Sequence, residues 1–216
     1  ESGIDDEEKI AVFDLDGTII DTSEDIAYSV NYLRKVQGLS SLRTEDVLKA
    51  VGLGLASLLK DMIGIDEENS EKQKAMLREY REHYNLHQGE RSKPYPGIED
   101  ALEQLCKQAD LYVLSNKPVN AVVRELELVE MTKRFKRIWG GGSFDKLKPD
   151  PIGINQAMKE TGSSSEKTIM IGDLFVDMET AARAGVHSIF VSWGFGVISD
   201  VRYAPSLIVN DPKELV

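Results

Sequence analysis

Polar side chains suited to phosphate chemistry follow four apolar stretches of this 216-residue sequence. They are, in chain order, Asp14, Asp16, Ser115, Lys148, Asp173 and Asp177. If the apolar stretches are parallel strands, these side chains meet at one edge of a sheet, because ligands of open parallel sheets bind beyond the carboxyl ends of the strands. The convergence of four separate segments is more informative than any single residue.

The aspartates indicate a metal site. Asp14, Asp16 and Asp173 together would form a dense negative pocket, which is costly without a compensating cation. Oxygen-rich sites of this kind suit Mg²⁺, which commonly keeps waters and is completed by a substrate phosphate. We therefore expect Mg²⁺ as the cofactor.

The other groups can act on a phosphoryl group beside such a metal. Lys148 would neutralise it, and the Ser115 hydroxyl would hydrogen-bond to it. A metal-shielded Asp14 can act as a nucleophile and split phosphate transfer into two steps through an aspartyl-phosphate. Asp16, two residues further on, would protonate the leaving oxygen and later deprotonate water.

The elements that position these side chains alternate between strands and helices. Strands are expected at 10–13, 111–114, 168–171 and 188–191, with weaker candidates at 137–139 and 207–209. Helical spacing of apolar residues marks 98–108, 119–126 and a helix through 178–182 that ends at Gly185. This alternation predicts an α/β fold with a Rossmann-like parallel sheet.

The first two strands are separated by far more chain than one crossover needs. A parallel crossover takes about a dozen residues, and the helix at 98–108 already supplies one, so residues 22–93 are in excess. We interpret residues 22–93 as an inserted, all-helical cap domain. Residues 1–21 and 94–216 would form the catalytic core.

Helical signals recur within this insert. A first helix is expected between Thr22, as N-cap, and Gly38, and a second at 55–62. Ser70-x-x-Gln73 resembles a capping box ahead of a longer helix. Residues 94–97, which include two prolines and a glycine, predict a turn-rich return to the core.

Four short motifs occur in order along the chain: 13–21, Ser115-Asn116-Lys117, Lys148-Pro149, and Gly172-Asp173 with Asp177. Together they resemble the four motifs of the haloacid dehalogenase-like superfamily, and the similarity extends over about residues 10–209. The insert between the first two motifs is similar to the helical cap of that superfamily's phosphatases.

The resemblance implies a role for each matching residue. Asp14 would be the nucleophile, and Asp16 would be the general acid and base with its backbone carbonyl on the metal. The metal ligands would be Asp14, Asp16, Asp173 and Asp177, with Asp177 either reaching the metal through water or orienting Lys148. The phosphoryl group would be held by Ser115, Asn116, Lys148 and Thr18. An aspartate at position 16 also distinguishes phosphate-ester enzymes from relatives that cleave phosphonates or carbon–halogen bonds.

Softer signals resemble the phosphoglycolate phosphatase branch of the superfamily. They lie at 51–55, 95–98 and 193–196. Leu174 departs from this pattern, since relatives often have Ser or Thr there. Gly52 and Leu53 would contribute to substrate specificity. A carboxylated substrate also needs a cation, for which the candidates in the insert are Arg34, Lys35, Arg43, Lys49 and Lys60.

Several functions are compatible with these motifs. The leading one is hydrolysis of a small phosphomonoester such as 2-phosphoglycolate. The alternatives are a phosphotransferase similar to β-phosphoglucomutase, a pyrophosphatase or a nucleotidase. A receiver or binding module that only accepts phosphate on Asp14 is a non-enzymatic alternative, but receiver domains are much shorter and have no insert.

Some of the same residues also have structural interpretations. Ser115 could cap the following helix, and Asp177 could interact with a helix dipole. His83 and His87 have a spacing that can bind zinc, yet they lack the glutamate of the metalloprotease motif and are interpreted as surface or packing residues. Residues 140–142 are expected to form a flexible glycine loop.

The charge, the single cysteine and the apolar runs of the sequence exclude several classes of protein. Lys and Arg total 26 against 37 Asp and Glu, a net charge of −11 that argues against a nucleic-acid binder. Cys106 is expected to be a core thiol, since it follows helical spacing. The chain has no apolar run of membrane-helix length, and its acidic start lacks the apolar region of a secretory signal. We expect a cytoplasmic monomer or homodimer whose partner is a small phosphorylated metabolite, with no membrane or nucleic-acid partner.

Overall fold

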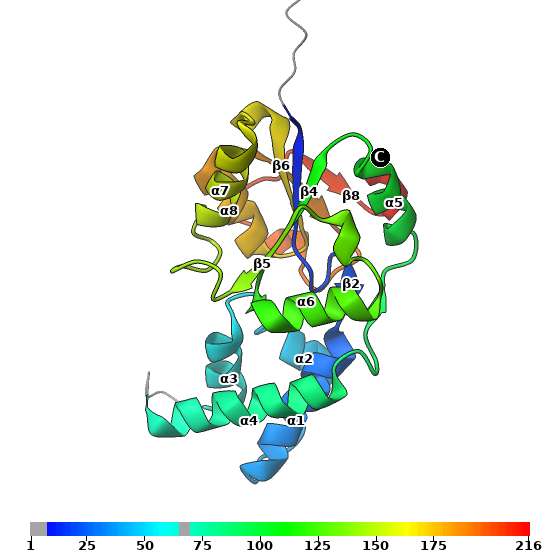
Figure 1. Cartoon of the computed structure of the whole chain (residues 1–216). Coiled ribbons are helices and arrows are strands. Elements are labelled where there is room, and N and C mark those ends of the chain that lie inside the picture. Colours follow the sequence, from blue (N-terminus) through cyan, green and yellow to red (C-terminus); the bar gives the residue numbers. More distant parts are fainter. Residues whose placement is uncertain (1–7, 65–69) are drawn as a thin grey trace, which may run out of the picture.

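A six-stranded sheet forms the centre of the molecule (Figure 1), which we describe from a computed structural model for residues 8–64 and 70–216. Its strands are β1 (Ile10–Phe13), β4 (Asp110–Pro118), β5 (Arg137–Gly141), β6 (Thr168–Gly172), β7 (His187–Val191) and β8 (Leu207–Val209). They lie in the order β5-β4-β1-β6-β7-β8, and all neighbouring strands are parallel. The predicted Rossmann-like α/β sheet is therefore confirmed.

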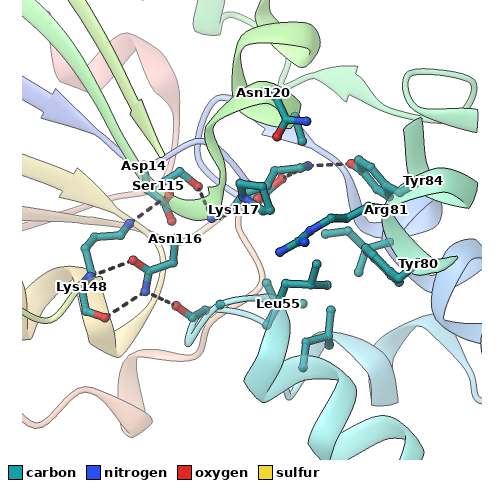
Figure 2. Close-up of a pocket in the computed structure, with 18 of the residues that line it drawn as sticks. Asp14, Leu55, Tyr80, Arg81, Tyr84, Ser115, Asn116, Lys117, Asn120 and Lys148 are labelled. Atoms are coloured by element: carbon teal, nitrogen blue, oxygen red, sulfur yellow. Dashed lines mark hydrogen bonds and ion pairs between the residues drawn. The ribbon is translucent and has the colours of Figure 1, made fainter. Parts of the chain in front are cut away.

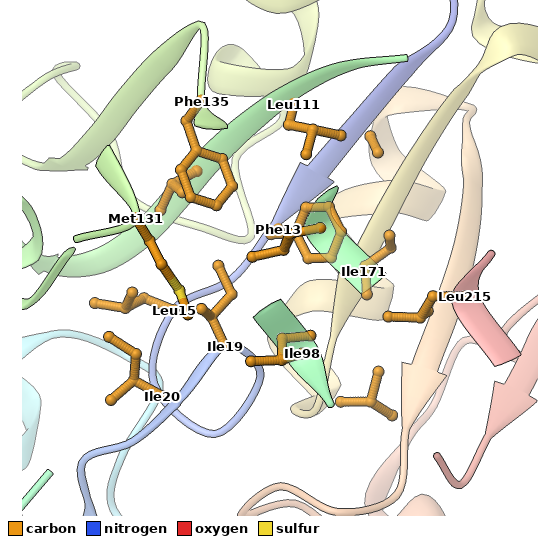
Figure 3. Close-up of a cluster of buried hydrophobic side chains, with 14 of the residues drawn as sticks. Phe13, Leu15, Ile19, Ile20, Ile98, Leu111, Met131, Phe135, Ile171 and Leu215 are labelled. Atoms are coloured by element: carbon orange, nitrogen blue, oxygen red, sulfur yellow. The ribbon is translucent and has the colours of Figure 1, made fainter. Parts of the chain in front are cut away.

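Helices cover both faces of this sheet, which explains why its central strand β1 is a continuous apolar run. These helices are α5 (Ile98–Leu105), α6 (Val119–Leu128), α7 (Ile152–Thr161) and α8 (Phe175–Ala184). Successive residues of β1 alternate between the faces. Phe13 shares an apolar cluster with Ile98 of α5 (Figure 3) and with residues of α6, whereas Val12 shares another with residues of α7 and α8.

A second group of helices lies beyond one end of the sheet (Figure 1). Within the described residues it comprises α1 (Ser23–Val36), α2 (Thr44–Leu48), α3 (Leu55–Ile63) and α4 (Glu71–His87). These helices have their own apolar core, which includes Ile26, Leu33, Leu59 and Tyr80. The chain enters and leaves this group through a short antiparallel pair, β2 (Ile20–Asp21) and β3 (Lys93–Pro94).

The remaining regular segments are single turns of 3₁₀ helix. They are η1 (Thr132–Arg134), η2 (Ser165–Lys167), η3 (Ile198–Asp200) and η4 (Pro212–Leu215). No helix in the described part of the chain is long and apolar enough to cross a membrane.

The two helix N-caps predicted within the insert differ in their side-chain hydrogen bonds. The Ser70 side chain accepts a hydrogen bond from the Gln73 backbone N–H at 3.1 Å, which confirms the N-cap bond of the predicted capping box of α4. Thr22 stands at the N-cap position of α1 but makes no cap hydrogen bond. Its hydroxyl donates to Asp16 instead, so the prediction that Thr22 caps the helix was wrong about its side chain.

Two other predictions were wrong. Cys106 is exposed, because α5 ends at Leu105 and the helical spacing that would bury Cys106 does not continue. Gly140 and Gly141 belong to β5 rather than to a loop. A Cβ on Gly140 would lie 2.6 Å from the Lys117 carbonyl oxygen, so the close approach of two backbones requires glycine there.

The histidine pair takes part in packing, as expected. The His83 ring stacks on Tyr32 with 4.0 Å between ring centroids and shares a 3.0 Å hydrogen bond with the Ser29 hydroxyl. His87 lies 3.0 Å from a Glu90 carboxylate oxygen.

Candidate active site

The polar ends of the central strands meet at one edge of the sheet. Asp14 follows β1, and its backbone N–H donates to the carbonyl of Ile171 at the end of β6 at 2.9 Å. Ser115 lies within β4, at a point where the pairing register with β5 shifts between Leu114 and Pro118. Ser115 is not the N-cap of α6, because Pro118 occupies that position. Figure 2 shows Asp14, Ser115 and Lys148 on the same side of the pocket.

Lys148 is fixed at both its backbone and its ammonium group. Its Nζ lies 3.0 Å from an Asp14 oxygen and 2.7 Å from an Asp177 oxygen. The Asn116 side chain accepts from the Lys148 backbone N–H at 2.8 Å and donates to the Lys148 carbonyl at 2.9 Å. Burial by itself lowers the pKa of Lys148, but the two carboxylates outweigh it and raise that pKa. Lys148 is therefore a charged, immobile cation beside Asp14.

Asp173 is fully buried, and both of its oxygens are hydrogen-bonded. One accepts from the Thr18 hydroxyl at 2.9 Å, and the other from the Phe195 backbone N–H at 2.7 Å. The surrounding backbone comes so close that a Cβ on Gly17 would lie 2.2 Å from the carboxylate. A Cβ on Gly194 would lie 2.3 Å from the Asp173 Cβ. Glycines at these two positions therefore allow the loops to enclose Asp173.

Three carboxylates form a compact oxygen cluster. Asp14, Asp173 and Asp177 each offer one oxygen, and these oxygens lie within 4.8 Å of one another. Burial raises the pKa of Asp14 to about 7 even though Lys148 opposes the shift. Burial and the charges of Asp14 and Asp177 also raise the pKa of Asp173 well above its usual value. A further positive charge would stabilise the ionised forms, and an all-oxygen donor set fits a hard divalent cation.

The Asp16 carboxylate points into a different network. One oxygen accepts from the Thr22 hydroxyl at 2.6 Å and from Lys117 Nζ at 2.8 Å. Lys117 Nζ also lies 2.6 Å from the Tyr84 hydroxyl and 3.3 Å from a Glu125 oxygen. Burial lowers the pKa of Lys117, but the Asp16 and Glu125 carboxylates more than compensate and raise it. A single buried lysine thus connects the loop after β1 with β4, α6 and α4.

A pocket opens between this edge of the sheet and the helical insert (Figure 2). Its sheet side includes Asp14, Asp16, Ser115, Asn116, Lys117 and Lys148. Its helical side includes Ile26, Val51, Gly52, Gly54, Leu55, Leu58, Tyr80, Arg81, Tyr84 and Asn85. Four of the six predicted chemistry residues, Asp14, Asp16, Ser115 and Lys148, therefore face the same space as the insert, whereas the fully buried Asp173 and Asp177 do not line the pocket.

The two residues expected to contribute to specificity differ in position. Gly52 lines the pocket, and its carbonyl accepts from the Asn116 side chain at 2.8 Å. Leu53 does not line the pocket and is 46% exposed, so the prediction for Leu53 was wrong. Gly52 and Gly54 both have positive φ angles, and the turn they form directs Leu53 to solvent.

The cations of the pocket are not those suggested for the insert. Arg34 donates to the carbonyls of Ser40 and Met62, and Arg43 and Lys49 pair with Asp46. The basic residues that line the pocket are instead Arg81, Lys117 and Lys148. Apolar spacing identifies the buried face of a helix, but it does not indicate which exposed residue of α4 borders a pocket.

Comparison with known proteins places this geometry in a family. Residues 11–191 match the family described as haloacid dehalogenase-like hydrolase. The chain belongs to this hydrolase family. The family predicted from the four ordered motifs is thereby confirmed.

Relatives of this haloacid dehalogenase-like hydrolase match over nearly their whole length. A phosphoglycolate phosphatase of Aquifex aeolicus (strain VF5) is 30% identical over 209 residues, which cover 96% of this chain and 95% of the relative. A phosphoglycolate phosphatase of Agrobacterium fabrum is 30% identical over 205 residues, covering 94% and 88%. The solved structure of a predicted phosphatase from Clostridium acetobutylicum superimposes with a TM-score of 0.85 at 29% identity, covering 97% and 96%. The two phosphoglycolate phosphatases belong to the branch that the sequence resembled.

Proposed function

We propose that this hydrolase is a Mg²⁺-dependent phosphatase that releases phosphate from a small phosphomonoester, with 2-phosphoglycolate as the leading substrate. The observation that carries the proposal is the placement of Asp14 against Lys148 in the lining of the pocket. Two relatives that match nearly the whole chain at 30% identity are phosphoglycolate phosphatases, which supports the choice of substrate.

Asp14, Asp173 and Asp177 are the side chains that would hold the metal. They fit Mg²⁺ because their donors are all carboxylate oxygens and because burial raises the pKa of Asp14 and of Asp173, which a nearby cation would offset. A bound Mg²⁺ would favour ionised Asp14 and offset the negative charge of the phosphate. Asp177 also holds Lys148 at 2.7 Å and accepts from the Leu174 backbone N–H at 3.0 Å, so it serves as a positioning residue as well.

The reaction would proceed in two steps through Asp14. An Asp14 oxygen attacks phosphorus, the ester P–O bond breaks, and Asp16 gives a proton to the leaving oxygen. A water molecule then attacks the aspartyl-phosphate and gives its proton to Asp16, which releases phosphate and restores the Asp14 carboxylate. Lys148 and the Ser115 hydroxyl would stabilise the phosphoryl oxygens throughout.

Two residues expected to bind phosphate have side chains committed to other groups. The Asn116 amide holds the backbone of Lys148 and the carbonyl of Gly52. The Thr18 hydroxyl donates to Asp173. We therefore assign their side chains positioning roles. Thr22 and Lys117 would likewise orient Asp16.

Residues 22–93 would act as a cap over a core formed by residues 1–21 and 94–216. Side chains of α1, α3 and α4 line one side of the pocket, and they would restrict access of bulk water to the phosphoryl group. The Tyr84–Lys117 and Gly52–Asn116 hydrogen bonds join this segment to the core beside the proposed catalytic groups.

Phosphate release from a panel of esters tests the proposal. The panel contains 2-phosphoglycolate, sugar phosphates, nucleoside monophosphates and pyrophosphate, each assayed with Mg²⁺ and after addition of EDTA. We expect turnover that requires Mg²⁺ and prefers a small monoester. Turnover that is unaffected by EDTA would contradict the metal requirement, and a preference for pyrophosphate or nucleotides would contradict the substrate class.

A further inference from the structure

We propose that Arg81 binds a carboxylate of the substrate, so that the pocket selects small phosphorylated acids over neutral phosphate esters. This inference rests on the proposed phosphatase function and identifies the feature by which that function would recognise its substrate.

The pocket has two ends of different chemistry. The sheet end carries the proposed phosphoryl-binding groups Ser115 and Lys148, whereas α4 contributes Tyr80, Arg81 and Asn85 to the other side. Figure 2 shows the Arg81 side chain extending from α4 into the pocket, with its guanidinium group pointing away from the helix. A substrate whose phosphate lies at Lys148 would present the rest of its structure toward α4.

Arg81 differs from the other two cations of the pocket in having an available charge. Lys148 is paired with Asp14 and Asp177, and Lys117 is paired with Asp16 and Glu125. Among residues 8–64 and 70–216, no carboxylate forms an ion pair with Arg81. Within this part of the chain, no ion pair compensates its guanidinium group.

The apolar walls of the pocket make the Arg81 charge important for binding a carboxylate. Ile26, Leu55, Leu58 and Ala121 line it with apolar surface. A carboxylate placed against apolar surface loses hydration and is unfavourable unless a partner replaces the lost hydrogen bonds. A guanidinium group offers two parallel N–H donors that match the two oxygens of a carboxylate.

The single charge of Arg81 also indicates which anion it would bind. A second phosphate group carries close to two negative charges at neutral pH, whereas a carboxylate carries one. Arg81 is the one cation on the helical side among the described residues that line the pocket. A phosphorylated acid with one carboxylate therefore matches the pocket better than a bisphosphate.

Position along α4, rather than the face of the helix, separates Arg81 from Arg78, which lies three residues earlier and one turn nearer the start of the helix. Arg81 and Asn85 are four residues apart, so they lie on one face of α4, and both line the pocket. Arg78 is exposed on the same helix and does not line the pocket. Arg78 is therefore a matched control for the loss of one positive charge from α4.

The test compares two esters that differ in the carboxylate. We would measure kcat and KM for 2-phosphoglycolate and for ethyl phosphate with wild type, Arg81→Ala, Arg81→Lys and Arg78→Ala. We expect Arg81→Ala to lower kcat/KM for 2-phosphoglycolate by about 10- to 100-fold, mainly through KM, since charge-assisted hydrogen bonds contribute about this much. The same variant should change kcat/KM for ethyl phosphate by less than about twofold, because that ester makes no such contact.

The other variants make the result specific. Arg81→Lys should recover part of the loss, and Arg78→Ala should resemble wild type with both esters. Equal losses on both esters in Arg81→Ala, or an unchanged KM for 2-phosphoglycolate, would overturn the assignment of Arg81 while leaving the phosphatase proposal in place. A wild type that releases phosphate from neither ester would contradict the phosphatase proposal itself, and the inference with it. Arg81 is exposed, so its replacement should leave the thermal unfolding midpoint unchanged, which serves as the folding control.

Discussion

The sheet edge and the α4 side of the pocket hold their charged groups in different ways. At the sheet edge, Asp14, Lys148 and Asp173 are buried and bonded to protein partners, and glycines enclose Asp173 closely. On the α4 side, Arg81 and Asn85 are exposed, and Arg81 has no ion-pair partner in the described residues.

This difference matches the separate demands of chemistry and recognition. Groups that act on a phosphoryl group must be preorganised, because their value depends on fixed geometry and low hydration. A group that recognises the variable part of a substrate needs an available charge. The comparison therefore predicts that substitutions at the sheet edge reduce turnover of every substrate, whereas substitutions on the α4 side change the choice of substrate.

Asp14→Asn should produce the largest effect. The amide is nearly isosteric with the carboxylate but is a poor nucleophile, so kcat should fall by about 10³-fold or more with every ester. Steady-state phosphate release measures this, with circular dichroism as the control for folding. Residual activity within about tenfold of wild type would contradict nucleophilic attack by Asp14.

Lys148→Met should reduce kcat by about 10²-fold or more, because it removes a cation that would stabilise the phosphoryl oxygens. It should also destabilise the fold, since Asp14 and Asp177 would lose their buried partner, and loss of one partner of a buried pair costs about 3–5 kcal/mol. Chemical denaturation without Mg²⁺ measures the second effect. An unchanged unfolding free energy would show that the ion pairs are not important for stability.

Lys117→Met should discriminate between leaving groups. If Lys117 orients Asp16 as an acid, the variant should lose about 10-fold in kcat for an alkyl phosphate, which is less than the roughly 10²- to 10⁴-fold that general acid–base catalysis itself contributes. It should lose much less for p-nitrophenyl phosphate, whose leaving group needs no proton. Tyr84→Phe, which removes one hydrogen bond to Lys117, should have a smaller effect of the same kind. Equal losses with both esters would indicate a structural role for Lys117 instead.

The smallest effects should come from two positions at the start of α3, where Leu53 precedes the helix and Leu55 is its first residue. Leu53→Ala should leave KM for 2-phosphoglycolate within about twofold of wild type, because Leu53 faces solvent. Leu55→Ala should raise that KM, because Leu55 lines the pocket. Equal KM values for the two variants would contradict the expectation that Leu55, but not Leu53, contacts the substrate.

Much of the sheet edge was predictable because topology enforces it. Asp14 and Asp173 follow apolar runs, and parallel strands carry such residues to one edge regardless of the distance between them in sequence. The family and the strands could be predicted for the same reason. Short elements such as α2 and β2 were missed because they contain too few residues to show a period.

The α4 side was less predictable, since recognition there depends on which exposed residues border a cavity. Arg81 resembles any solvated arginine in the sequence, and only packing of the insert against the core brings it to the pocket. The network around Lys117 was missed for a related reason, because its partners Tyr84 and Glu125 come from different helices and have no fixed spacing from it.

Phosphate released per chain from 2-phosphoglycolate, followed over time with Mg²⁺ present, tests the central proposal most directly. A phosphatase should release many equivalents per chain, and both EDTA and Asp14→Asn should stop the release. Release that ends at one equivalent or less per chain, with folded protein and excess ester, would contradict the phosphatase function and favour a module that only accepts phosphate.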